Sequence, residues 1–177
     1  MATSGTTTFD LSIDDIIEEA YERCGVRTSS GYDLKSARRS LNILFSEWGN
    51  RGVHLWKVEL KEQLLSAGTR TYTAPSNAND ILEAYISTTT SLTTSTNEVS
   101  LTKISRSEYA ALPNKGAQGQ PSQYYVDRQT TPTITLYQTP DATTYTYLKY
   151  YYLKRIEDAG AYTNQADVVF RFIPCMV

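Results

Sequence analysis

The sequence predicts an α+β fold in which an antiparallel helical hairpin or bundle carries an inserted, mainly antiparallel β-subdomain. Apolar residues recur with a helical period before Gly52, the period changes to two after it, and the chain is apolar again after Asp167. We therefore expect four parts: a flexible N-terminal arm (1–11), the helical hairpin (12–53), the β-subdomain (54–160) and a C-terminal segment that returns to the helical part (161–177).

The clearest helical pattern runs from Asp33 to Gly52. Its apolar residues have the i, i+3, i+4, i+7 spacing of one buried helix face: Leu34, Ala37, Leu41, Leu44, Phe45 and Trp48. Asp33 stands where an N-cap side chain accepts free amide hydrogens, and Gly52 stands where a left-handed residue ends a helix. The pattern predicts a helix that buries this face against another element.

A second helical pattern precedes it, and Ser12 with Asp15 is expected to cap its start. One face of this segment is apolar: Ile13, Ile16, Ile17, Ala20, Tyr21 and Cys24. Gly25 closes it, and only a short Gly/Ser loop separates the two patterns. This arrangement predicts an antiparallel pair of helices.

The two predicted helices carry opposite charges. The first is acidic on its outer face, with Asp14, Asp15, Glu18, Glu19 and Glu22, and the second is basic near its start, with Lys35, Arg38 and Arg39. The acidic face is either solvated or in contact with the basic face of another copy. Our candidate contact residues are Asp14, Asp15, Glu18, Lys35, Arg38, Arg39, Phe172 and Ile173.

After Gly52 the sequence predicts about seven short strands and one short helix. We expect residues 53–65 to pair with 69–75, 80–92 to pair with 98–105, and three more strands at 122–128, 133–139 and 145–155. Ser105 and Glu108 form a capping-box pattern that predicts a helix over 105–112. The Gly/Pro-rich segment 114–123 is expected to be an exposed, mobile loop.

The segment after Asp167 ends on apolar residues, so we expect it to dock against the helices or a neighbouring subunit, or to begin a further helix. The two cysteines, Cys24 and Cys175, are expected to pack as small hydrophobes.

The composition narrows the function classes. The formal net charge of -2 gives no general electrostatic reason to bind nucleic acid or an acidic membrane. There is no apolar run of bilayer-spanning length and no signal-peptide pattern, so we expect a soluble chain without a membrane partner.

The sequence shows no motif that would support catalysis, and we expect neither an enzyme nor a cofactor. His54 is the only histidine, no cluster has metal-ligand spacing, and the GAQGQP loop lacks the lysine and helix of a phosphate-binding loop. Asp80 and Glu83 could form a pair of acids, but carboxylates three residues apart are more often solvated. The excess of tyrosine over phenylalanine, fourteen against four, instead favours surfaces that are partly apolar and partly hydrated.

The order of these features resembles a known family. Three stretches are similar to the head-to-tail adaptors of short-tailed bacteriophages. They are ARRSLNILFSEWGNRGVHLW, a strand segment ending in TRTYTAP, and the run from LTKISRSEYAALPNKG through GQPSQYYVDR and YQTPDA to YLKYYYLKR. The resemblance extends from about Asp14 to Phe172.

The resemblance implies a ring of twelve copies at the virion neck, assembled in the host cytoplasm, with the portal protein and the next tail protein (nozzle or tail tube) as partners. DNA would pass through without sequence-specific binding. The alternative is a carbohydrate-binding or adhesive β-module, for which Tyr124, Tyr125, Tyr150, Tyr151 and Tyr152 would supply stacking rings.

Overall fold

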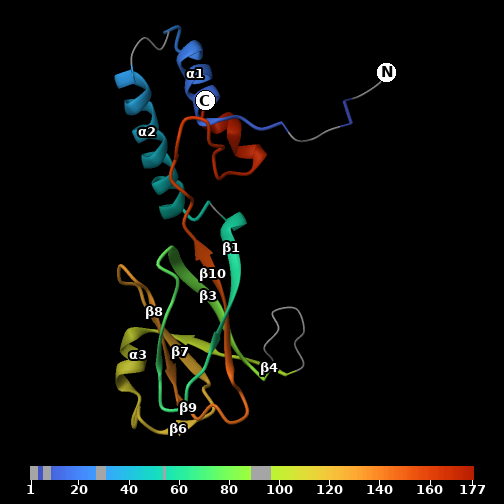
Figure 1. Ribbon diagram of the computed structural model, residues 1–177. Helices are drawn as coiled ribbons and strands as arrows, with labels where there is room; N and C mark the ends of the chain where they lie inside the picture. The colour runs from blue at the N-terminus through green and yellow to red at the C-terminus, as the bar shows by residue number, and fades with distance from the viewer. Residues whose placement is uncertain (1–3, 6–8, 27–30, 54, 89–96) are drawn as a thin grey trace. The chain divides into compact units, whose positions relative to one another are not determined.

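The computed structural model describes residues 4–5, 9–26, 31–53, 55–88 and 97–177 (Figure 1). The fold is α+β, and the chain divides into two compact units. The helical unit comprises Met1–Trp56 and Ile156–Val177, and the β unit comprises Lys57–Arg155. The helical unit is therefore built from both ends of the chain.

The helical unit contains α1 (Ile13–Arg23), α2 (Gly31–Asn50) and a C-terminal 3₁₀ helix, η2 (Phe170–Cys175). A second 3₁₀ helix, η1 (Leu55–Lys57), leads into the first strand. One core cluster joins residues of α1, α2 and the C-terminal segment: Ile13, Ile16, Ile17, Leu41, Phe45, Ile156, Ala159, Ile173 and Met176. Leu34, Ala37, Leu44 and Trp48 are partly buried against this cluster, so the apolar stripe predicted for α2 does face the core.

Most of the predicted helix ends are confirmed. Ser12 and Asp15 form a reciprocal capping box at the start of α1. Gly25 and Gly52 have the positive φ angles of 71° and 69° that a left-handed helix end requires. The prediction for Asp33 is wrong, because α2 begins at Gly31 and Asp33 lies inside its first turn. An acid there still interacts favourably with the helix dipole.

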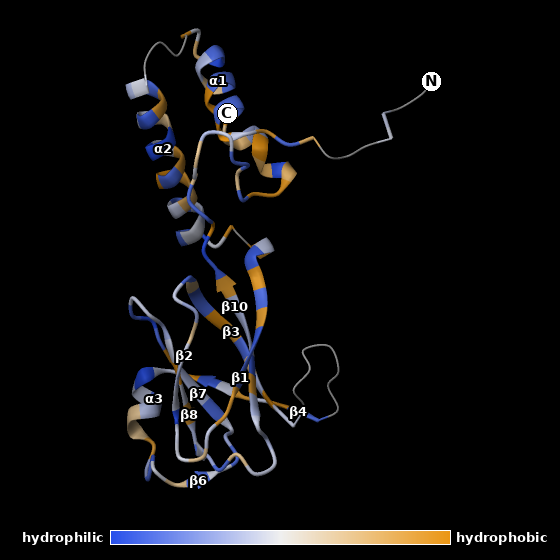
Figure 2. Ribbon diagram, in the orientation of Figure 1, coloured by the Kyte–Doolittle hydropathy of each residue, from blue (hydrophilic) through white to orange (hydrophobic). Residues whose placement is uncertain are grey.

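The C-terminal segment packs within the helical unit, as expected. Ile173 and Met176 are buried, and the Phe172 ring lies 5.4 Å from the Trp48 ring and 4.8 Å from the Trp56 ring. Figure 2 shows this segment, red in Figure 1, as mostly hydrophobic. The prediction for the cysteines is wrong, since both are exposed: Cys24 is the C-cap of α1, and Cys175 ends η2 beside the buried Met176.

In its described residues, the β unit contains two four-stranded sheets and a small third sheet. The first has the order β1-β10-β3-β4 and is antiparallel: β1 Val58–Leu64, β10 Tyr147–Lys154, β3 Ala78–Ser87 and β4 Glu98–Ser100. The second has the order β2-β8-β7-β5: β2 Thr71–Thr73, β8 Thr133–Tyr137, β7 Gln123–Asp127 and β5 Thr102–Ile104. Strands β6 (Gln118–Gly119) and β9 (Thr139–Pro140) pair in parallel, and the helix α3 (Arg106–Ala111) has the predicted Ser105–Glu108 capping box.

Two predicted pairings are wrong or incomplete. β1 does not pair with β2: it pairs with β10, while β2 pairs with β8 in the other sheet. The segment 98–105 is divided between the sheets, with β4 beside β3 as expected and β5 parallel to β7. The buried Leu101 lies between β4 and β5, so this short segment crosses the core.

Tyrosines help to fill the core of the β unit. Tyr124, Tyr150 and Tyr152 are buried with Ile81, Ile86, Ile134, Leu136 and Leu148. These three rings cannot stack on a sugar at the surface, which corrects the alternative predicted from the sequence. Of the five tyrosines named for that alternative, Tyr125 is half-buried and Tyr151 is 39% exposed.

Segment 114–123 contains a short strand, β6, where the sequence predicted a loop throughout. Its residues Gln118 and Gly119 pair with β9, and the Thr139 hydroxyl donates to the Lys115 carbonyl at 2.9 Å. The Lys115 ammonium donates in turn to the Leu112 and Ala110 carbonyls at the end of α3. Backbone and side-chain hydrogen bonds thus hold a segment that has few apolar side chains.

Candidate interaction surfaces

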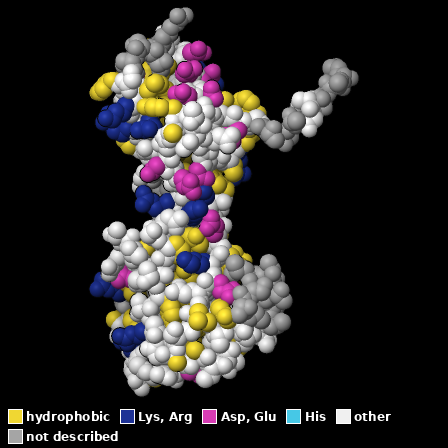
Figure 3. Space-filling model, in the orientation of Figure 1, with side chains coloured by type: hydrophobic (Ala, Val, Ile, Leu, Met, Phe, Trp, Pro, Cys, Tyr) yellow, Lys and Arg dark blue, Asp and Glu magenta, His cyan; other side chains and the backbone are white. Residues whose placement is uncertain are grey.

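The outer faces of α1 and α2 carry opposite charges. Figure 3 shows acidic side chains over α1 and basic side chains over α2. Asp14, Glu18 and Glu22 are spaced four residues apart and form one row on α1. Lys35 and Arg39 have the same spacing on α2.

Four of the eight predicted contact residues are engaged inside the helical unit. The Asp15 carboxylate accepts from the Ser12 hydroxyl at 2.6 Å and from the Ser12 amide at 3.0 Å, and these bonds lower the pKa of Asp15. The Arg38 guanidinium donates to the Gly160 carbonyl at 3.2 Å and lies over the Tyr162 ring. Ile173 is buried in the core, and the half-buried Phe172 ring packs against the Trp48 ring. These four side chains therefore have internal roles.

The other four predicted residues, Asp14, Glu18, Lys35 and Arg39, lie on the outer faces. On α2, the two cations border a shallow groove of about 290 Å³ that Tyr32, Ser36, Arg38 and Asn42 also line. Two large apolar side chains on this face were not among the predicted contact residues: Tyr32 (74% exposed) and Ile43 (63% exposed). The sequence does indicate that they are exposed, since both lie outside the apolar stripe of α2 that faces the core.

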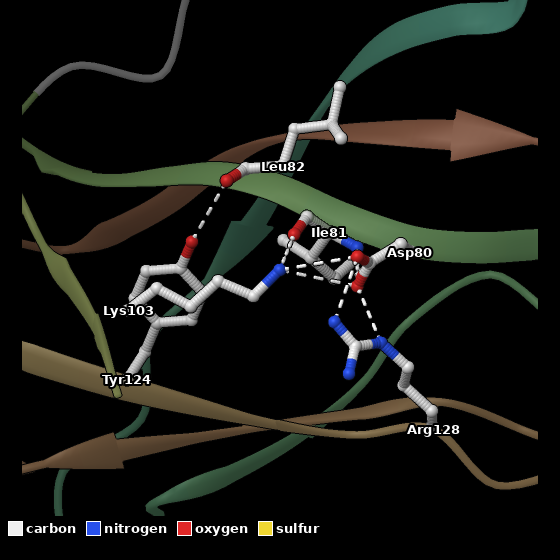
Figure 4. A network of polar contacts seen from close by, with 6 residues as sticks. All are labelled: Asp80, Ile81, Leu82, Lys103, Tyr124 and Arg128. Atoms are coloured by element: carbon white, nitrogen blue, oxygen red, sulfur yellow. Dashed lines mark hydrogen bonds and ion pairs between the residues drawn. The ribbon is translucent and has the colours of Figure 1, made fainter. Parts of the chain in front are cut away.

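A polar network in the β unit connects the two sheets (Figure 4). Asp80, on β3 of the first sheet, accepts from the Lys103 ammonium at 3.3 Å and from the Arg128 guanidinium at 3.0 and 3.1 Å. Lys103 is on β5 of the second sheet, and Arg128 directly follows β7. Tyr124, on β7, donates to the Leu82 carbonyl at 3.2 Å.

The network alters the acidity of Asp80. Burial alone would raise the pKa of this carboxyl, but the hydrogen bond from Arg128 and the nearby charges of Lys103 and Arg128 outweigh it, so the pKa is lowered. Glu83, the other member of the acid pair considered from the sequence, instead accepts from the Tyr85 hydroxyl. The two carboxylates therefore do not share a site in the structure.

A further cation of the β unit is buried. Lys149 on β10 is 2% exposed and donates to Glu98 of β4 at 2.9 Å. It is in register with Glu62 on β1 and Tyr85 on β3. Burying a cation is costly unless it is paired and hydrogen-bonded, and Glu98 supplies that partner.

Neither a metal centre nor a membrane span was found where the structure describes the chain. Among those residues, no three or more His, Cys, Asp or Glu side chains are placed to hold a metal ion. Within the same residues, no helix is long and apolar enough to cross a membrane.

A comparison with protein families gives a match. Residues 10–174 match the family described as SU10 adaptor protein. The matched range includes α1, α2, α3 and all ten strands of the described structure. The search of curated proteins gives no match.

Proposed function

We infer the function from the premise that this chain belongs to the SU10 adaptor protein family. It is therefore a structural adaptor of a bacteriophage, a virion component of the head–tail junction. We propose that it assembles as a ring, twelve-fold in the virion, that joins the portal protein to the next tail protein and extends the DNA channel. The ring would assemble in the host cytoplasm and remain at the virion neck.

The observation that carries this proposal is the length of the family match, because it includes the main elements of both units. The exposed side chains of α2 give it a physical basis. Aromatic, apolar and arginine side chains are enriched at the centres of protein interfaces, and Tyr32, Ile43 and Arg39 are of these kinds. An adaptor needs such surfaces for its neighbours.

We further propose that DNA passes through the ring without being gripped. Several cations of the β unit already have acidic or carbonyl partners: Lys103 and Arg128 share Asp80, Lys149 contacts Glu98, and Lys154 contacts Glu59. A duplex binder that neutralised several phosphates would need free clustered cations, and its affinity would fall by about one log unit per log unit of salt for each phosphate.

The test is to mix the full chain with purified portal protein and to record particle mass and negative-stain images. We expect rings on the portal, and weak duplex binding by the chain in low salt. A chain that stays monomeric with and without portal would contradict the adaptor function. A monomer that binds polysaccharide would favour the carbohydrate-binding alternative, and tight, steeply salt-dependent duplex binding would contradict the passive channel.

A further inference from the structure

The like-charged rows on α1 and α2 are unfavourable within each helix. Neighbours of the same sign at i, i+4 destabilise a helix by about 0.2–0.5 kcal/mol per pair. The same helices also carry oppositely charged pairs at this spacing, Glu19–Arg23 and Glu47–Arg51. The rows Asp14–Glu18–Glu22 and Lys35–Arg39 instead place equal charges side by side.

The side chains of these rows have no partner within the part of the chain that the structure describes. Glu18, Glu22, Lys35 and Arg39 are exposed, and none of their side chains takes part in a hydrogen bond or ion pair there. Arg38, the third cation of this region, donates to Gly160 instead. Within the described residues, the two rows are thus unpaired charges on the outer surface of the helical unit.

On α2 the basic row continues into exposed apolar side chains. Tyr32, Lys35, Arg39 and Ile43 follow one another at spacings of three and four residues, so they form one strip of about 16 Å along the helix. We call this the α2 strip. A groove of about 290 Å³ runs beside its first three residues. The strip combines an aromatic ring, an aliphatic side chain and two cations, as the contact region of an interface does.

We propose that the α2 strip of one copy binds the acidic row Asp14–Glu18–Glu22 on α1 of a second copy. The inference rests on the proposed function, since it supplies the subunit contact of the ring. The acidic row extends about 12 Å along α1, which is long enough to face both cations of the strip. A second copy fits because the same chain carries both complementary surfaces.

This pairing has a consequence for assembly. The two surfaces lie on different helices, so the contact is heterologous and leaves one strip and one acidic row free at the ends of each dimer. Further copies can therefore add, and the assembly closes into a ring where the rotation permits. Because the charges are exposed, salt should weaken the contact.

The test uses charge reversal in the full chain, with particle mass measured against protein concentration at low and high salt. Lys35→Glu with Arg39→Glu, or Glu18→Lys with Glu22→Lys, should each raise the concentration needed for assembly about tenfold or more at low salt. The chain that carries all four changes should assemble like the parent, because its charges are exchanged. An equimolar mixture of the two double variants should also assemble.

The matched control for Lys35→Glu with Arg39→Glu is Lys61→Glu with Arg70→Glu, which makes the same change in net charge at two exposed positions of the β unit. Circular dichroism and melting temperature should show that every variant is folded. Two results would overturn the α2 strip proposal alone. In one, the double variants of α1 and α2 assemble as well as the control does; in the other, the chain that carries all four changes fails to assemble. A parent chain that forms no oligomer, even with portal protein, would overturn the proposed function as well.

Discussion

Asp80→Asn tests whether the Asp80 network holds the two sheets of the β unit together. The substitution keeps the shape of the side chain and removes its charge. In the parent, Asp80 accepts from Lys103 and Arg128, which come from the second sheet and from the residue after β7 (Figure 4). Asparagine can accept one of these hydrogen bonds but cannot balance two cations.

The expected loss follows from the exposure of the three groups. The Arg128 side chain is 59% exposed, Lys103 is 33% exposed and Asp80 is 29% exposed. Solvent therefore screens both ion pairs, and each contributes closer to the 0.2–1 kcal/mol of exposed pairs than to the value of a buried pair. We expect Asp80→Asn to lower the free energy of unfolding by about 1–2 kcal/mol at neutral pH.

The loss should depend on pH in a defined direction. The pKa of Asp80 is lower in the folded chain than its ordinary value of about 3.9, so the charged form stabilises the fold above that value. This contribution disappears as the pH falls through the folded pKa of Asp80. The parent and Asp80→Asn should therefore differ in urea unfolding at neutral pH and converge in strongly acidic solution.

Two results would refute this reasoning. Equal stability at neutral pH would mean that the network contributes nothing beyond solvated charges. A difference of the same size at every pH would assign the effect to packing or geometry instead of charge. Asp127→Asn serves as a control, because Asp127 ends β7 next to Arg128 in the chain but accepts from Gln129 outside the network.

The remaining predictions concern the two cores. Leu41→Ala should lower the free energy of unfolding by about 2–5 kcal/mol, and Leu44→Ala by less, because Leu41 is buried and Leu44 only partly buried. Equal melting temperatures for the parent and Leu41→Ala would contradict the helical core. Tyr150→Phe should leave the free energy of unfolding unchanged or raise it, since the buried Tyr150 hydroxyl has no hydrogen-bond partner in the described structure. Tyr124→Phe should lower it by about 1 kcal/mol, because the hydrogen bond to the Leu82 carbonyl is lost. Urea unfolding that ranks the two variants in the opposite order would refute this. Burial raises the pKa of both tyrosines to about 12, so the fold should lose stability as the pH rises above their ordinary pKa of about 10. Spectrophotometric titration of the folded chain should then show a group of tyrosines that ionises late. Ionisation of all tyrosines near pH 10 in the folded chain would contradict this prediction.

The parts of the fold that sequence reasoning predicted correctly depend on neighbours in the chain. Both capping boxes and the glycine helix ends involve residues within about two helical turns, and the apolar stripe of α2 repeats at spacings of three and four residues within one helix. The exception is Asp33, because an aspartate is favourable both as an N-cap residue and within the first turn of a helix. Local rules therefore identify a helix more reliably than they fix its first residue.

Strand partners could not be read from the same rules. The segments of β1 and β2 are close in sequence and have a turn between them, but β1 pairs with β10, and Glu59 reaches Tyr152 across 93 positions. The choice depends on which faces the sheets bury together, and alternation within one strand does not contain that information. Tyrosine burial was missed for a similar reason, because an aromatic ring with a hydroxyl suits a core as well as a surface.

The candidate surfaces were only partly predictable. The sequence indicates opposite charges on α1 and α2, but not which of them have partners within the chain. Arg38 donates to Gly160, 122 positions away, while Arg39 beside it is exposed. Asp80 similarly obtains its partners 23 and 48 positions later. Separating free charges from engaged ones requires the tertiary structure.

The pairing of β1 with β10 explains how one chain can build both units. Val58 at the start of β1 is in register with Leu153 near the end of β10, so the chain enters and leaves the β unit at adjacent positions. The residues after β10 then complete the helical core, in which Ile156, Ala159 and Ile173 are buried with Ile13 and Leu41. The charged faces of α1 and α2 are therefore displayed by a unit whose core contains the C-terminal segment. Because the core depends on this segment, a chain that ended after the β unit would leave apolar side chains of α1 and α2 exposed, and the surfaces proposed for assembly would lose their rigid support.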